Sequence, residues 1–201
     1  MTKALVVDEN TSYIKELEEL TKKHFDQVDV VRIEKFKSED VNGYDLVVLS
    51  GSHGHRYFGN KEFWKEIEDL IQKHPVPILG ICFGLRIFGH NYNAEIEMLP
   101  EKRKGVMEIR KIKDDPVFLD LNKFSGFKSN TSDNIKVKEA HRWSVKSLDK
   151  PLIALAESDD GIEIVKHESK PFYGFQFHPE VLEEDNDGHL LFANAVKELL
   201  R

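Results

Sequence analysis

The chain has 201 residues, of which 40% are hydrophobic and 32% are charged, and its formal net charge is −7. This composition excludes a disordered or membrane-embedded protein, and the acidic balance disfavours a general nucleic-acid binder. The single cysteine, Cys82, excludes an intramolecular disulfide and any multi-cysteine zinc site. We expect a single domain over residues 1–201, located in the cytoplasm, with no membrane partner.

The first half of the sequence alternates strand-like and helix-like patterns. Strands are predicted at residues 4–7, 28–33, 46–49 and 76–81. Apolar residues at helical spacing predict helices near residues 14–25 and 63–71, the first capped by Thr11 or Ser12. This order favours an α/β fold, a mostly parallel open sheet flanked by helices on both sides.

The second half changes to shorter, partly alternating runs. Strands are predicted at residues 106–112, 152–156, 162–165 and 172–177, and a closing helix near residues 190–199. Asp159-Asp160-Gly161 is a hairpin turn signal between two of these strands. The polar stretch 122–133 is predicted to be a loop. We therefore expect a small antiparallel element added to the open sheet.

The first candidate motif, Gly80-Ile81-Cys82-Phe83-Gly84, directly follows a predicted strand. It matches the thiol form of the nucleophile elbow, in which a tight strand-to-helix turn lifts the nucleophile out of the sheet. The N-terminus of the following helix favours a thiolate over a thiol. The alternative is a buried structural cysteine beside glycines that serve helix packing.

The second candidate motif is Gln176-Phe177-His178-Pro179-Glu180. A thiol nucleophile needs a base, and an imidazole base needs an acceptor that orients it. His178 can be the base and Glu180 the acceptor, because side chains two positions apart on an extended segment point the same way. The alternative is a turn that carries a surface histidine and glutamate.

The third candidate motif, Ser50-Gly51-Ser52-His53-Gly54, ends the third predicted strand. Ligands of open parallel sheets gather at such strand ends, and a glycine-containing loop there can aim backbone N–H groups at an oxyanion. The alternative is an ordinary strand-to-helix loop. A metal site at His53 and His55 would lack its remaining ligands, so no metal is expected.

Together these motifs resemble the class I glutamine amidotransferases of the triad type. The matching segments Leu49–Ser52, Pro77–Gly84 and Tyr173–Val181 stand in the family's order, and the resemblance covers nearly the whole chain. It is strongest to free-standing glutaminase subunits, notably the small subunit of two-subunit GMP synthases. The resemblance implies a flavodoxin-like sheet and no cofactor.

The resemblance also implies a mechanism with L-glutamine as substrate. Cys82 attacks the side-chain amide carbon, His178 passes the thiol proton to departing ammonia, and Glu180 holds the imidazole. Backbone N–H groups of Ser52 and Phe83 would form the oxyanion hole. Water then hydrolyses the γ-glutamyl thioester, and ammonia passes to a synthetase on a separate chain.

Departures from the family's pattern concern substrate binding, which the resemblance assigns to Gly51, Arg86 and His141. Where the family usually reads Gly-His-Gln after the nucleophile, this chain reads Gly84-Leu85-Arg86. Arg86 can donate two hydrogen bonds to a carboxylate, or it marks a different γ-glutamyl substrate. His141 falls where the family often has a Ser-His pair, and it either contacts substrate or partner or is a surface residue on a strand end.

Two other functions stay open. A stand-alone thiol hydrolase of γ-glutamyl amides or peptides would account for Leu85-Arg86 in place of His-Gln. A non-catalytic regulatory subunit would retain the fold without turnover, but the complete set of Cys82, His178 and Glu180 argues against it.

Overall fold

A computed structural model describes residues 1–53, 61–121, 134–182 and 186–201, with the backbone alone for residues 61–64. The predicted loop at 122–133 and the residue His55 therefore lie outside the described residues. The strands are β1 (Lys3–Asp8), β2 (Gln27–Arg32), β3 (Leu46–Leu49), β4 (Ile78–Ile81), β5 (Glu95–Met98), β6 (Gly105–Lys111), β7 (Asn134–Glu139), β8 (Trp143–Ser147), β9 (Leu152–Ser158), β10 (Gly161–His167) and β11 (Phe172–Phe175). The helices are α1 (Ile14–Lys22), α2 (Lys61–Lys73), α3 (Phe83–Asn91) and α5 (Gly188–Leu199), with short 3₁₀ turns η1 (Ser38–Val41) and η3 (Pro116–Phe118).

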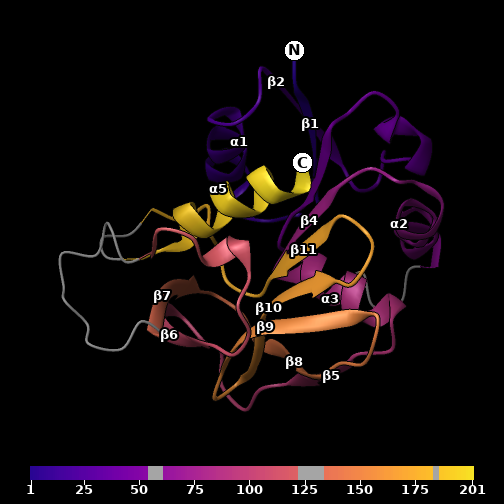
Figure 1. Cartoon of the computed structure of the whole chain (residues 1–201). Coiled ribbons are helices and arrows are strands. Elements are labelled where there is room, and N and C mark those ends of the chain that lie inside the picture. The colour runs from indigo at the N-terminus through magenta and orange to yellow at the C-terminus, as the bar shows by residue number, and fades with distance from the viewer. Residues whose placement is uncertain (54–60, 122–133, 183–185) are drawn as a thin grey trace.

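A single eleven-stranded sheet runs through the described residues in the order β2-β1-β3-β4-β11-β10-β9-β6-β7, and β8 joins it between β10 and β5 (Figure 1). The pairs from β2 to β11 are all parallel. The strands β3 and β4 are buried along their whole length, as expected for a parallel sheet covered on both faces. This half of the sheet confirms the predicted α/β fold.

Helices cover both faces of the parallel strands (Figure 1). On one face, alternate β1 residues such as Val6 join a buried cluster with Leu17 of α1 and Phe192 of α5. On the other face, Val7 joins a second cluster with Leu70 of α2 and with α3. Successive strand residues point to opposite faces, so each apolar run of the sequence supplies two cores.

The antiparallel element extends the sheet beyond β11. β10 pairs antiparallel with β11, β9 with β10, β6 with β9, and β7 with β6. The predicted hairpin between β9 and β10 is confirmed, because Gly161 has φ +143° and pairs with Ser158. The strands β5, β7 and β8 were not predicted, because polar residues interrupt their apolar pattern.

The predicted cap of the first helix is wrong. α1 begins only at Ile14, and no side chain caps it. The Thr11 hydroxyl instead accepts a hydrogen bond from the Tyr13 N–H at 3.2 Å, and the Asp8 carboxylate accepts one from Asn10 at 2.9 Å. Thr11 therefore stabilises the turn that leads from β1 into the helix.

No helix in the described ranges combines the length and the apolar character that crossing a bilayer requires.

Candidate active site

Cys82 occupies the turn between β4 and α3. Its backbone has φ 51° and ψ −91°, a conformation that residues with a side chain rarely adopt. The flanking glycines allow this turn, because a Cβ at Gly80 would lie 2.7 Å from the Gly84 backbone and one at Gly84 would lie 2.6 Å from the Leu49 carbonyl oxygen. The structure thus has the strand–turn–helix geometry that the motif predicts, with the thiol at the carboxyl end of the parallel strands.

Pairing of β4 with β11 brings His178 beside Cys82. Ile81 pairs with Phe175, and the Cys82 N–H donates to the Phe175 carbonyl at 2.6 Å, so the two segments stay paired beyond the strands. The His178 N–H donates to the Lys138 carbonyl at 2.8 Å, which fixes the segment that follows β11. The space beside Gly51 borders both Cys82 Cβ and the His178 ring, so the imidazole and the thiol lie side by side, and each shifts the pKa of the other. Residues distant in sequence therefore meet because their strands are neighbours.

Glu180 orients the His178 ring, since His178 Nδ1 lies 2.8 Å from Glu180 Oε1. His178 is 4% exposed and Glu180 is 1% exposed. The alternative interpretation of these two residues as a surface turn is therefore wrong. A buried carboxylate on Nδ1 leaves Nε2 for the thiol, which is the tautomer that a base requires.

The electrostatics of the site favour a thiolate and an imidazolium. Burial alone would raise the pKa of Cys82, but the charge and hydrogen bond of His178, with the charge of Arg86, lower this pKa to about 6. Burial alone would lower the pKa of His178, but the charges of Glu180 and of the Cys82 thiolate raise it well above its ordinary value. The two groups therefore stabilise each other's charged forms.

Tyr13 and Gly51 both lie against the imidazole ring of His178. The Tyr13 ring meets the His178 ring edge-on, with centroids 5.1 Å apart. A Cβ at Gly51 would lie only 2.9 Å from His178 Cε1, so Gly51 provides room for the ring. Sequence reasoning assigned Gly51 to the substrate and missed Tyr13, whose position before a helix carries no motif.

Arg86 and Gln176 direct donors at the Cys82 sulfur. Arg86 is 5% exposed, and its Nη2 lies 3.8 Å from Cys82 Sγ, while its guanidinium lies 5.3 Å from the centroid of the Phe83 ring. Gln176, the residue after β11, has its Nε2 3.7 Å from Sγ. Donors at a sulfur stabilise its negative form, so both side chains support the thiolate.

A cavity of about 190 Å³ opens beside the thiol. Ser52, Phe83 and Arg86 line it on the side of the parallel strands, and the segment 140–143 with Lys102 forms the opposite wall. The structure therefore brings the predicted Ser52, Phe83, Arg86 and His141 around Cys82. The volume suits a molecule the size of an amino acid rather than a large ligand.

His141 is a buried wall of this cavity, so its interpretation as a surface residue is wrong. It is 3% exposed, its Nε2 lies 2.8 Å from Glu139 Oε2, and its Nδ1 lies 3.1 Å from the Trp143 carbonyl oxygen. Burial lowers the pKa of His141 and raises that of Glu139 to about 7. His141 Nδ1 thus faces the Trp143 carbonyl and Nε2 faces the Glu139 carboxyl group.

Comparison with known proteins identifies the family. The model of the family "Glutamine amidotransferase class-I" matches residues 5–198. The chain belongs to the class I glutamine amidotransferases. This confirms the resemblance found in the sequence, and it makes the chain an enzyme of the glutamine-hydrolysing type.

Similar curated proteins include the glutamine-hydrolysing GMP synthase subunits of Methanothermobacter thermautotrophicus and Pyrococcus furiosus. The first is 32% identical over 127 residues, which are 63% of this chain and 62% of that protein. The second is 31% identical over 156 residues, 76% of each chain. The GMP synthase of Dictyostelium discoideum is 27% identical over 90% of this chain, but only 24% of its own length is covered.

Solved structures share the fold of this glutamine amidotransferase. A putative GMP synthase subunit from Thermoplasma acidophilum has a TM-score of 0.81 at 23% identity, and the match covers 99% of this chain and 94% of that one. A glutamine amidotransferase from Thermotoga maritima has a TM-score of 0.68 at 19% identity, covering 90% and 76% respectively. Both likenesses confirm the flavodoxin-like fold class.

Proposed function

We propose that the chain hydrolyses the side-chain amide of glutamine with a Cys82–His178–Glu180 triad and supplies the ammonia to a synthetase on a separate chain. The observation that carries the proposal is the buried Cys82–His178 pair, with Glu180 on His178 Nδ1, at the edge of an amino-acid-sized cavity. Family membership supports glutamine as the substrate. The whole of residues 1–201 would act as one glutaminase domain.

The reaction would begin with attack of the Cys82 thiolate on the amide carbon. His178, charged after taking the thiol proton, would protonate the leaving nitrogen, so that ammonia departs and a γ-glutamyl thioester remains. His178 would then take a proton from water, whose oxygen attacks the thioester carbon and releases glutamate. Glu180 would keep the ring oriented throughout and stabilise its positive charge.

The negative oxygen of each tetrahedral intermediate would face the backbone N–H groups of Ser52 and Phe83. Both residues line the cavity beside the thiol, Ser52 on the loop after β3 and Phe83 directly after the Cys82 turn that follows β4. Phe83 is the first residue of α3, so the positive end of the helix dipole points at the developing charge. Fixed donors of this kind need no rearrangement when the charge appears.

Substrate binding is assigned to Gly51, Arg86 and His141, with different roles. The Arg86 guanidinium is buried at the cavity and would donate to a carboxylate or carbonyl oxygen of the substrate. Gly51 would act through the space that it leaves for His178. His141 would contact the substrate with its ring edge, because both nitrogens already have partners.

GMP synthase is the proposed destination of the ammonia. The matched relatives from two archaea are each named as one subunit of that enzyme, and their names imply a second subunit. The chain spans 62% of the first of them, and 24% of the single-chain GMP synthase of D. discoideum. The subunit names of the two relatives support the proposal that the acceptor-activating part resides on another chain.

A diazo-ketone analogue of glutamine tests the site directly. The expected result is one adduct on Cys82 by intact mass and peptide mapping, protected by glutamine and lost in the His178→Ala variant. A Cys82→Ser variant is the matched control, since it keeps the size of the side chain. Alkylation of Cys82 by iodoacetamide without labelling by the analogue would contradict the proposed glutamine site.

The partner is tested by a coupled assay. Mixing the chain with the synthetase subunit of a GMP synthase from the same organism, ATP and xanthosine monophosphate should yield GMP with glutamine as nitrogen source. With ammonium salts in place of glutamine, the synthetase subunit should form GMP in the absence of this chain. GMP formation from ammonia but not from glutamine would contradict the assignment of this partner.

Arg86 favours a second candidate function, a stand-alone thiol hydrolase of γ-glutamyl amides or peptides. Its buried guanidinium stands beside the thiol, where the family usually places a glutamine. This function predicts a higher kcat/KM for γ-glutamyl peptides than for glutamine without any partner, and a reversal of that ratio in Arg86→Gln. Equal or better turnover of glutamine by the unmodified chain would exclude it.

A further inference from the structure

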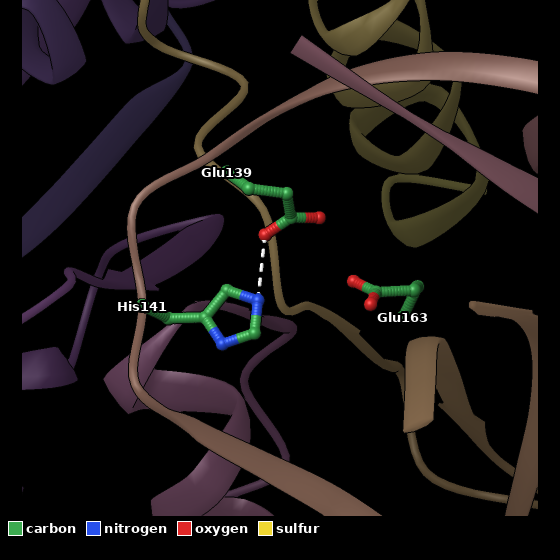
Figure 2. Close-up of side chains that lie close together, drawn as sticks. All are labelled: Glu139, His141 and Glu163. Atoms are coloured by element: carbon green, nitrogen blue, oxygen red, sulfur yellow. Dashed lines mark ion pairs between the residues drawn. The ribbon is translucent and has the colours of Figure 1, made fainter. Parts of the chain in front are cut away.

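Three buried side chains meet behind the cavity wall. Glu139 is the last residue of β7, His141 follows two residues later, and Glu163 lies on the neighbouring part of β10. Figure 2 shows the three pointing toward one another, and their ligand atoms lie within 4.8 Å of each other. They are 2%, 3% and 1% exposed, respectively. We propose that they bind a divalent transition-metal ion, for which Zn²⁺ is the probe.

No lysine or arginine balances the two carboxyl groups of the cluster. In the described part of the chain, no lysine or arginine forms an ion pair with Glu139 or Glu163. Glu139 Oε1 and Glu163 Oε2 are buried and have no hydrogen-bond partner outside the cluster among the described residues, and the two carboxyl groups interact with each other. Two buried carboxyl groups without a cation are strongly unfavourable in their charged form. A divalent cation between them would neutralise both and coordinate the unpartnered oxygens.

The histidine is oriented as a metal ligand. The Trp143 carbonyl can only accept a hydrogen bond, so His141 Nδ1, 3.1 Å away, carries the proton. The neutral ring then presents the Nε2 lone pair to Glu139 Oε2 at 2.8 Å, and two acceptors that close need either a proton or a metal ion between them. Metal-binding histidines typically donate their other N–H to a carbonyl in this way.

The second carboxylate is oriented as well. The Ser158 hydroxyl donates to Glu163 Oε1 at 2.7 Å, and this contact leaves Oε2 toward the cluster. His141 and Glu163 thus each have a supporting contact outside the cluster, which is the arrangement that holds ligands in place around a metal.

The donor set indicates which ion fits. One imidazole nitrogen and two carboxylate oxygens suit first-row divalent ions such as Zn²⁺, whereas Mg²⁺ and Ca²⁺ prefer oxygen donors alone. Three protein ligands leave a coordination position open. Because His141 lines the same cavity as Cys82, the ion would enter from the cavity and lie directly behind its wall.

The test measures metal binding and not turnover, so its outcome is independent of the proposed glutaminase activity. Untagged protein is stripped with a chelator, titrated with Zn²⁺ by calorimetry, and analysed for metal content by mass spectrometry. We expect one bound ion per chain and a rise in Tm of about 5 °C at Zn²⁺ concentrations far above Kd.

Variants distinguish Zn²⁺ binding at this cluster from Zn²⁺ binding by other side chains. Glu163→Gln, which is nearly isosteric, should weaken Zn²⁺ binding at least about tenfold. If the Glu163→Gln protein does not fold, Glu163→Asp takes its place with the same expected result. Cys82→Ser should bind Zn²⁺ as the parent chain does, because the sulfur is not a proposed ligand. His189→Gln on α5 is the matched control for loss of a histidine elsewhere.

Cobalt substitution adds a spectroscopic criterion. Co²⁺ bound to one imidazole and two carboxylates should show d–d absorption without a thiolate-to-metal charge-transfer band. Fewer than one ion per chain, binding that survives Glu163→Gln at full affinity, or binding that disappears in Cys82→Ser would overturn the proposal and leave protons as the occupants of the cluster.

Discussion

The pH dependence of Cys82 alkylation should report the Cys82–His178 interaction directly. In the parent chain the pKa of Cys82 is lowered to about 6, so the thiolate is present above that pH and is lost as the pH falls through it. Replacing His178 with alanine removes the largest stabilising contribution and leaves the effect of burial. The midpoint should then move above the ordinary cysteine value of about 8.5.

The expected rise in the pKa of Cys82 changes both the fraction of thiolate and the reactivity of that thiolate. A change of about 2.5 pKa units corresponds to about 3 kcal/mol of preference for the thiolate. At pH 7 the thiolate fraction would fall from about 90% to about 3%. A thiolate of higher pKa is, however, about tenfold more nucleophilic, with a Brønsted coefficient of about 0.4–0.5. The rates at pH 7 would therefore differ only a few-fold, and the midpoint is the decisive quantity.

The assay is simple because the chain has one cysteine, so adduct formation by intact mass reports Cys82 alone. Iodoacetamide rates would be measured from pH 4.5 to 9.5 on the parent chain, His178→Ala and the control His24→Gln, whose ring packs on Phe192 away from the site. A parent midpoint above pH 8, or an unchanged midpoint in His178→Ala, would refute the thiolate–imidazolium pair.

Further predictions concern the site and the fold. Arg86→Met should raise the alkylation midpoint by less than the His178 variant does, because the Arg86 charge lowers the pKa of Cys82 to a smaller extent. Glu180→Gln should lower kcat for glutamine at least about 100-fold with little change in KM, because the His178 ring loses the carboxylate that orients it and fixes its tautomer. Gly84→Ala should lower the free energy of unfolding by about 1–3 kcal/mol in urea, because its Cβ would meet the Leu49 carbonyl oxygen at 2.6 Å. Burial lowers the pKa of His24, so the folded chain binds fewer protons than the unfolded one near pH 6, and stability should rise as the pH rises through this range. The Tm of His24→Gln should depend less steeply on pH near pH 6 than the Tm of the parent chain. Equal slopes of Tm against pH would contradict this prediction.

The parallel half of the sheet could be predicted from sequence because its strands are apolar on both faces. β3 was predicted with its observed bounds, Leu46–Leu49. β7 could not be predicted in this way, because Lys138 and Glu139 are buried polar residues that break the apolar pattern. Their burial follows from pairing with β6 and from the segment after β11, whose His178 N–H donates to the Lys138 carbonyl. Tertiary contacts of this kind leave no local signal.

The candidate site likewise contains residues that could be predicted from the sequence and residues that could not. Cys82, His178 and Glu180 could be named from their motifs, since each chemical role depends on a short local pattern. The Glu139–His141–Glu163 cluster could not, because β10 brings Glu163 to the other two only in the folded chain. The polar neighbours of His141 made it resemble a surface residue, and Tyr13 lies in no motif at all.

The neighbouring positions of β4 and β11 have an evolutionary consequence. Residues 92–171, which build the entire antiparallel region and one wall of the cavity, leave after α3 and return at β11. The hydrogen-bonded register between Ile81 and Phe175 sets the spacing of nucleophile and base, and the Lys138 carbonyl of the intervening segment adds a contact to the His178 N–H. Where the Lys138 contact is kept, insertions, deletions or substitutions in the rest of this segment can therefore reshape what the cavity admits while the spacing of Cys82 and His178 stays constant.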